Sequence, residues 1–317
     1  MNVAPVMQST LSTFKKSTKL MGNLFEITAV GEDQLNAETQ IQGAIDEIKR
    51  IEILLTTFNE DSQTNQINQA AGLRPVQVDE EVFRLIQRSL KISNLTQGAF
   101  DITYGSMDKK FWNFDITMDR LPDPIAAKES VRLINYRNVI LDESDFSVFL
   151  TQKGMRIGFG GIGKGYAAEQ AKRCMQASGV QAGIINASGD LCTWGRSPEG
   201  AAWTIGIADP FSRLNIFSEL ELKDMSVATS GDYEKYVIID GKKYSHTIDP
   251  RSGYPVHGIT SVTIISPNAE LSDAMTTPVM VMGIQKGLFM INQMNGIGCI
   301  LIDDHGKLYK SNNIKLN

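Results

Sequence analysis

The sequence predicts an α+β protein in which mixed or antiparallel sheets are packed by helices. Two observations predict this class. Helical and strand-like segments are mixed along the chain without the regular alternation of a doubly wound parallel fold. Several strand-like runs also follow one another directly, and Asp240-Gly241 between two of them is a strong hairpin signal. With 317 residues, 42% of them hydrophobic, the chain can form one large domain or two medium ones.

The elements expected in the first half follow from hydrophobic spacing. Alternating apolar residues predict a strand over Leu24–Val30. Apolar residues at helical spacing predict helices over 36–55 and 79–96, and acidic residues at the start of the second suit a helix N-terminus. The polar stretch 56–72 between them is expected to be rich in turns.

The second half begins with short elements and then becomes strand-rich. A short helix is expected over 126–134, two short strands over 137–150, and a glycine-rich turn followed by a helix that ends near Gly179. The strand-like runs that follow are AGIINAS, WTIGIAD, FSELELKD, YVIIDGKKYSH and ITSVTIIS. Two helices over 269–283 and 285–295, and a closing hairpin in IGCILIDDHGKLYK, complete the expected fold.

Composition narrows the classes of partner. The formal net charge is −5 and no basic stripe is present, which argues against nucleic acid. The 3 cysteines are far apart and lack metal-ligand spacing, so they are expected to be buried apolar residues. No transmembrane segment is expected, because no apolar run approaches the length of a membrane span. Residues 1–20 are polar, lack the apolar core of a signal peptide, and are expected to form a flexible leader.

The glycine stretch Gly158–Gly165, GFGGIGKG, is the first candidate for chemistry. Glycines before a helix let backbone amides approach a phosphate closely, and Lys164 adds a cation there. The spacing is not that of a P-loop, because Gly165 stands where that motif needs a hydroxyl. A tight strand-to-helix turn without a ligand explains the same residues.

The segment Ala269–Gly283 offers hard oxygen ligands. Asp273 and Thr277 are four residues apart on an expected helix, so they share one face. A carboxylate, a hydroxyl and a nearby carbonyl, completed by phosphate and water, suit Mg²⁺. A carboxylate near a helix start and a threonine bonded to its own helix are the alternative. The polar stretch Ser226–Tyr236 has a similar ambiguity between phosphate donors and a simple turn.

His246 is the strongest of the 3 histidines as a candidate base. It is flanked by Ser245 and Thr247 and precedes Asp249 by three residues, and histidine titrates near neutrality. His257 and His305 lie in turn-like contexts and are expected to be exposed. Together with the glycine turn and the oxygen ligands, His246 favours phosphoryl or nucleotidyl transfer, although each signal alone is modest.

The chain resembles the ApbE family, the FAD:protein FMN transferases. The resemblance rests on an ordered series: LMGNLFEI, FNEDSQTNQIN, TQGAFDIT, GGIGKGYAAE, NASGDL, VATSGDY, SHTIDPRSGYP and SDAMTTPVMVMG. The series covers about residues 20–310, so it is far more specific than any one motif. It implies a T-fold-like architecture in which residues 21–317 form a single flavin transferase domain of two intimately packed subdomains.

The resemblance implies a reaction and its partners. FAD would bind with Mg²⁺ on its diphosphate, a threonine hydroxyl of an acceptor flavoprotein would attack the FMN phosphorus, and AMP would leave. Family members usually act in the periplasm or at the cell envelope, often as lipoproteins. This sequence starts without a signal or a lipid-attachment cysteine, so an anchor would require a segment lost from the N-terminus.

The resemblance also assigns roles to single residues. His246 matches the general base, and Gly161, Asp273 and Thr277 match the magnesium ligands. The positions that match contacts with FAD are Met21, Phe58, Ala99, Phe100, Asp101, Lys164 and Ile248.

The chain departs from the family at several positions. Gly158 stands where the family often has aspartate, Gly163 where alanine is usual, and Phe58 where tyrosine is common. Glu169 and Ser188 replace a frequent aspartate and a frequent glycine. These changes affect the expected affinity for FAD more than the reaction class. Two other functions stay open at this point: a Mg²⁺-dependent FAD pyrophosphatase that gives FMN and AMP, and an FAD-binding protein without turnover.

Overall fold

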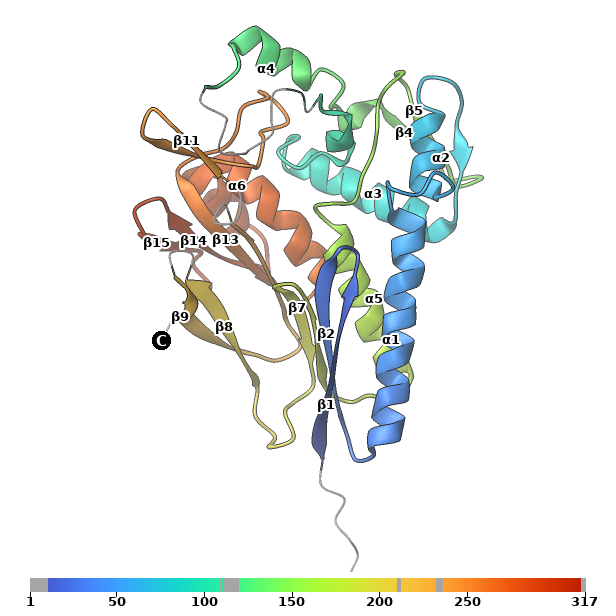
Figure 1. The fold of residues 1–317 in the computed structure, drawn as a ribbon, viewed down its shortest axis with the longest axis vertical. Coiled ribbons are helices and arrows are strands. Elements are labelled where there is room, and N and C mark those ends of the chain that lie inside the picture. The colour runs from blue at the N-terminus through green and yellow to red at the C-terminus, as the bar shows by residue number, and fades with distance from the viewer. Residues whose placement is uncertain (1–10, 109, 111–119, 210–211, 232–235, 315–317) are drawn as a thin grey trace, which may run out of the picture.

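The computed structural model describes residues 11–108, 110, 120–209, 212–231 and 236–314, and its largest element is an eight-stranded sheet (Figure 1). The strand order is β1-β2-β6-β7-β10-β13-β14-β15, with every neighbouring pair antiparallel. The strands are β1 Ser12–Leu20, β2 Asn23–Gly31, β6 Gly183–Ala187, β7 Asp190–Trp194, β10 Ser226–Gly231, β13 Ile259–Ser266, β14 Gly298–Asp303 and β15 Leu308–Lys310. The predicted α+β class is confirmed.

The edge strand β1 corrects one expectation. Residues 12–20 were expected to belong to a flexible leader, but they pair with β2 along their whole length, from Ser12 opposite Gly31 to Leu20 opposite Asn23. Their polarity has another cause: β1 is an edge strand with most side chains exposed, and lysines on an edge discourage pairing with other chains. Residues 1–10 lie outside the described part of the chain.

Three helices cover one face of this sheet. They are α1 Gln34–Leu55, α5 Gly163–Ala177 and α6 Ala269–Ile291, and they pack against one another and against the strands. Alternate residues of a strand point to opposite faces, so Ile264 of β13 joins the core under the helices, whereas Ile265 joins a second cluster. That second cluster contains residues of the hairpin formed by β8 Trp203–Asp209 and β9 Ser212–Leu222, which covers the other face.

A smaller group of elements lies beyond the end of α1. It contains α2 Gln63–Gln69, α3 Glu80–Leu95, η1 Ile102–Ser106, α4 Pro124–Ser130, η3 Tyr136–Asn138 and the sheet of β3 Val76–Gln77, β5 Ser147–Leu150 and β4 Val139–Asp142. Helix α2 replaces part of the expected turns, because the Ser62 hydroxyl caps it by accepting the Asn65 amide at 3.1 Å.

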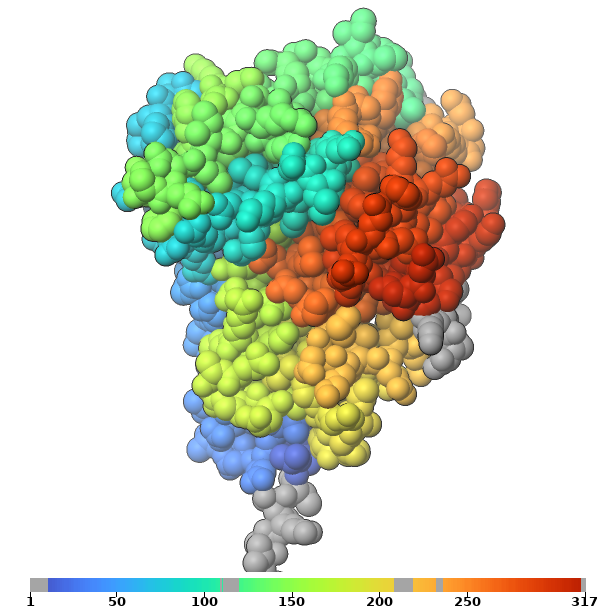
Figure 2. Space-filling view, turned by 180° about the vertical axis from the view of Figure 1, so that it is seen from behind, coloured from blue at the N-terminus to red at the C-terminus, as the bar shows by residue number. Residues whose placement is uncertain are grey.

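One hydrophobic core joins both groups of elements. It contains Phe83 and Ile86 of α3 together with Ile45 and Ile48 of α1 and Ile162 before α5. Seen from behind in Figure 2, the teal residues of α3 lie against the orange residues of α6, far apart in sequence. The division into two subdomains stays a prediction.

The remaining expected elements are found with small shifts. Between β11 Tyr236–Ile239 and β12 Lys242–Ser245, Asp240 and Gly241 have φ values of 50° and 73°, as the predicted hairpin turn requires. The two helices expected near the C-terminus are the halves of α6, which break at Gly283, where φ is 81° and ψ is 169°. Cys192 and Cys299 are buried and Cys174 is half-buried.

Helix α6 is also the one described helix whose length and composition would suit a membrane span. Half of its most apolar window is buried within the protein, against β10 and β13. Its place in the core therefore accounts for its apolar composition.

Candidate active site

The glycine turn brings the start of α5 against α6. A Cβ at Gly165 would lie 2.2 Å from the Ala269 carbonyl oxygen, so only glycine permits this approach. Ile162 occupies the N-cap position without a side-chain cap, and instead Asp273 of α6 accepts the Gly165 amide at 2.9 Å. The predicted phosphate-binding turn is thus fixed by the carboxylate predicted to hold a metal.

The three predicted metal ligands lie in one region. Asp273 and Thr277 are on the same face of α6, one turn apart, as predicted. A Cβ built on Gly161 would lie 3.9 Å from the Thr277 hydroxyl oxygen and 3.4 Å from the Phe100 ring. The loop carbonyl, the hydroxyl and the carboxylate therefore come from α6 and from the turn in front of α5.

A buried charge cluster lies behind these oxygens. Lys164 forms an ion pair with the buried carboxylate of Asp190 at the start of β7. The other oxygen of Asp190 accepts the Thr229 amide at 3.3 Å. Burial raises the pKa of Asp190, against the influence of Lys164. Burial and the nearby Asp190 charge raise the pKa of Asp273 to about 7. Two carboxylates thus share one ammonium group here.

Eight of the predicted site residues line one cavity of about 620 Å³. They are Phe58, Ala99, Phe100, Asp101, Gly161, His246, Ile248 and Thr277. Met21, Lys164 and Asp273 do not line it. Asp273 is buried and precedes Thr277 by one helical turn. Met21 lies in the β1–β2 turn, and its methyl group is 3.7 Å from the position that a Cβ on Gly163 would occupy.

Asp101 holds in place the cavity wall that it forms with Ala99 and Phe100. One oxygen of its carboxylate accepts the Thr103 amide at 2.8 Å and the Thr103 hydroxyl at 2.6 Å, and the other accepts the Tyr136 amide at 2.9 Å. Burial raises the pKa of Asp101, while the bonds from Thr103 oppose this rise. Both oxygens are therefore engaged within the protein, and Asp101 shapes the wall that presents Phe100.

The loop after β12 forms another wall of the cavity and carries His246. Backbone bonds from Ser245 to Val256 and from Val256 to Thr247 fold the loop back on itself, and Ile248 bridges to Pro255. His246 is exposed on this wall. In the same loop, the carboxylate of Asp249 accepts hydrogen bonds from the Arg251 guanidinium at 2.8 and 2.9 Å.

Tyr104 links this loop to the smaller group of elements. Burial raises its pKa to about 12, against a hydrogen bond with the Ile248 backbone. His257 and His305 are exposed, as predicted.

Sequence reasoning missed three functional candidates: Tyr104, Arg156 and Asp190. Arg156 lines the cavity but stands in a segment without a recognisable pattern. Asp190 lies within the NASGDL segment used for the family resemblance, where an acidic residue just after a tight turn is a usable signal. Its partner Lys164 lies 26 positions away, so the pair itself could not be predicted.

Comparison with known proteins shows which family the chain belongs to. The model of the ApbE family matches residues 21–301. The chain belongs to the ApbE family. An FAD:protein FMN transferase of Klebsiella pneumoniae (strain 342) is 35% identical over 291 residues, which cover 91% of this chain and 89% of the relative.

Solved ApbE structures agree with this fold along almost the whole chain. The ApbE protein of Thermotoga maritima has a TM-score of 0.85 at 30% identity, and the match covers 95% of this chain and 97% of that one. The apo form of the flavinyl transferase ApbE of Pseudomonas stutzeri has a TM-score of 0.83 at 26% identity, covering 98% of this chain and 97% of that one.

Proposed function

We propose that this ApbE family member is an FAD:protein FMN transferase that moves FMN from FAD to a threonine hydroxyl of an acceptor protein and releases AMP. The observation that carries this proposal is that His246, Thr277, Gly161 and Phe100 all line one cavity. Its volume of about 620 Å³ is within the range of small-molecule and cofactor sites. The relatives that carry this name support the same function.

The residues behind the cavity fit a magnesium ion. Asp190 and Asp273 are both buried, and Lys164 forms an ion pair with Asp190. Burial first, and the nearby Asp190 charge second, raise the pKa of Asp273, so a further cation would be favourable here. No cluster of three or more His, Cys, Asp or Glu side chains is found among the described residues. A site with one or two carboxylates suits Mg²⁺, whose remaining coordination positions are usually filled by phosphate oxygens and water.

The proposed ligands are Asp273, the Thr277 hydroxyl and the Gly161 carbonyl. Bound Mg²⁺ would neutralise charge on the diphosphate during the displacement. Lys164, in the first turn of α5, adds a cation near these groups.

His246 acts as the general base. It takes the proton of the threonine hydroxyl as the oxygen forms its bond to the FMN phosphorus, while the bond from that phosphorus to the AMP oxygen breaks. Its exposure suits this task, because the acceptor threonine must arrive from another protein. Periplasmic or cell-envelope localisation stays an expectation from the family resemblance.

The test is an incubation of the protein with FAD, Mg²⁺ and an acceptor protein that carries the target threonine. Mass spectrometry of the acceptor and chromatography of the nucleotides are measured together. Transfer predicts acceptor labelling matched by an equal amount of AMP. FMN and AMP without labelling would indicate hydrolysis, and tight FAD binding without AMP would indicate a binding protein; either result contradicts the proposal.

A further inference from the structure

Arg156 brings a permanent positive charge to the cavity and has no role in the mechanism above. Among the described residues that line the cavity, it is the one lysine or arginine. We propose that Arg156 holds the isoalloxazine ring of FAD beside Phe58, a position that the family resemblance already assigns to FAD, with the guanidinium donating hydrogen bonds to acceptors on the ring. This inference rests on the proposed function and adds a specificity residue to it.

The backbone of Arg156 is fixed in place. Its amide donates to the Ser106 hydroxyl at 2.7 Å, and that hydroxyl contacts the Arg156 carbonyl oxygen at 3.1 Å. The side chain is held more loosely. Its Nη2 is 3.4 Å from the Asn65 Oδ1, and within the described part of the chain it pairs with no carboxylate. The guanidinium is therefore positioned beside the cavity and keeps donors for a ligand.

Asn65 connects Arg156 to the loop that carries Phe58. Its amide nitrogen donates to the Thr57 carbonyl at 2.9 Å and to the Asn59 carbonyl at 2.7 Å. Asn65 is itself buried. One side chain thus sets both the loop with the aromatic ring and the place of the guanidinium.

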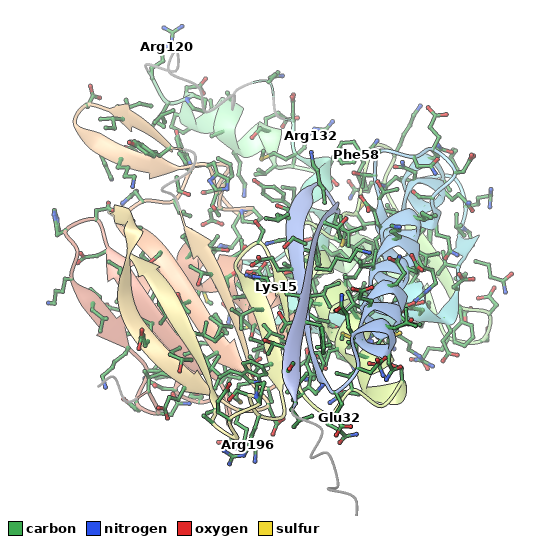
Figure 3. The ribbon with its side chains drawn as sticks, turned by 60° about the horizontal axis from the view of Figure 1, so that its bottom comes forward. Lys15, Glu32, Phe58, Arg120, Arg132 and Arg196 are labelled. Carbon is green, nitrogen blue, oxygen red and sulfur yellow. The ribbon has the colours of Figure 1, made fainter. Side chains whose placement is uncertain are left out.

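Phe58 is an apolar ring without a protein partner to cover it. It is 98% exposed, although it lines the cavity, and Figure 3 labels it beyond the end of α1. A large aromatic side chain left in water beside a cavity is well suited to stacking on a flat ligand ring.

Gly158, two residues after Arg156, also lines the cavity. A Cβ at Gly158 would meet only Thr57, at 3.9 Å, and its φ is not in the left-handed region. The backbone therefore does not require glycine there. The missing side chain leaves room for a ligand and places no carboxylate at position 158 to compete for Arg156.

The donor pattern favours the flavin over the adenine. A guanidinium has five donors and no acceptor in a planar fork, and it also stacks on aromatic faces. The pyrimidine ring of isoalloxazine carries one donor, N3–H, between its two carbonyls. It also presents two pairs of neighbouring acceptors, N1 with the C2 carbonyl oxygen and N5 with the C4 carbonyl oxygen, and either pair matches two donors of the fork. The adenine edge sets an amino donor beside its acceptors. Arg156 thus marks the flavin end of the cavity, and the adenosine lies toward the other end.

Three variants test this assignment. Arg156→Gln removes the charge, Arg156→Lys keeps the charge without the fork, and Lys153→Gln is the matched control, an exposed cation three residues away that does not line the cavity. Binding of FAD, FMN and ADP is measured by calorimetry. We expect both Arg156 variants to lower the binding affinity for FAD and for FMN about tenfold, which corresponds to about 1.4 kcal/mol of binding free energy. Binding of ADP should stay within about twofold, and Lys153→Gln should bind all three as the wild type does.

The outcomes separate this inference from the proposed function. An equal loss of ADP and FAD affinity, or full retention by Arg156→Lys, would make Arg156 a general anion attractor and overturn the inference. Unchanged FAD binding in both variants would overturn it too, while transfer by the wild type would leave the proposed function intact. A wild-type protein that binds no flavin would contradict both.

Discussion

The carboxylate of Asp273 on α6 accepts a hydrogen bond of 2.9 Å from the amide of Gly165 in the first turn of α5. This places a carboxyl group at a helix N-terminus, where the partial charge of the helix dipole is positive. It also fixes the separation of the two helices that supply the proposed phosphate turn and the proposed magnesium ligands.

Gly165→Ala should destabilise the protein and disturb the site. The new methyl group would lie 2.2 Å from the Ala269 carbonyl oxygen and 2.6 Å from the Asp273 Cβ, so backbone must move. Overpacking of this kind costs about 1–3 kcal/mol. Gly160→Ala is the control, because a Cβ there meets nothing within 4 Å. Urea unfolding of both variants would show the difference, and equal stabilities would contradict the close approach of the helices.

The metal-free protein should lose stability as the pH rises toward and through 7. Burial and Asp190 raise the pKa of Asp273 from 3.8 to about 7, so the folded protein holds this proton more tightly than the unfolded chain does. The stabilisation is full below the unfolded pKa and is lost as Asp273 ionises. Thermal unfolding with a chelator between pH 5 and 8 measures it. Asp273→Asn should flatten the slope, and an identical slope would count against the assignment.

His246→Ala should slow FMN transfer about 10²–10⁴-fold, the usual contribution of a general base, and leave FAD binding nearly unchanged. The matched control is His257→Ala, another exposed histidine close in sequence but outside the cavity lining. Single-turnover labelling of the acceptor measures the rate. A wild-type rate in His246→Ala would remove this residue from the mechanism.

Phe58→Ala should weaken FAD binding without lowering the melting temperature. The ring is 98% exposed, so its removal takes almost no buried apolar area from the folded protein. Loss of stacking on a ligand ring should cost about tenfold in FAD affinity. Phe100→Ala is the contrasting variant, because Phe100 is 6% exposed and its loss should destabilise the core. A clear drop in the melting temperature of Phe58→Ala would show that the loop depends on the ring.

The sequence was sufficient for elements with strong local patterns. The spacing of Ile41, Ile45 and Ile48 predicted α1, and Asp240-Gly241 predicted the β11–β12 turn, because neighbouring residues determine both. Strand β1 was missed, since its polar side chains are those of a sheet edge and only pairing with β2 reveals it.

For the site, the order of the motifs predicted which residues take part but not which residues they contact. Asp273 and Thr277 could be placed together because helical spacing fixes their relation. The ion pair of Lys164 with Asp190 joins α5 to β7, and the engagement of both Asp101 oxygens joins η1 to Tyr136. Such contacts depend on tertiary packing, so local sequence patterns do not encode them.

The walls of the cavity extend from Thr57 to Thr277 in the chain, and its last contributor is on α6. During synthesis from the N-terminus, most of the chain leaves the ribosome before the cavity can close. The complete cavity therefore forms only after α6 has been synthesised. Until α6 has been synthesised, the segments that precede it keep their part of the shared core exposed and accessible to chaperones.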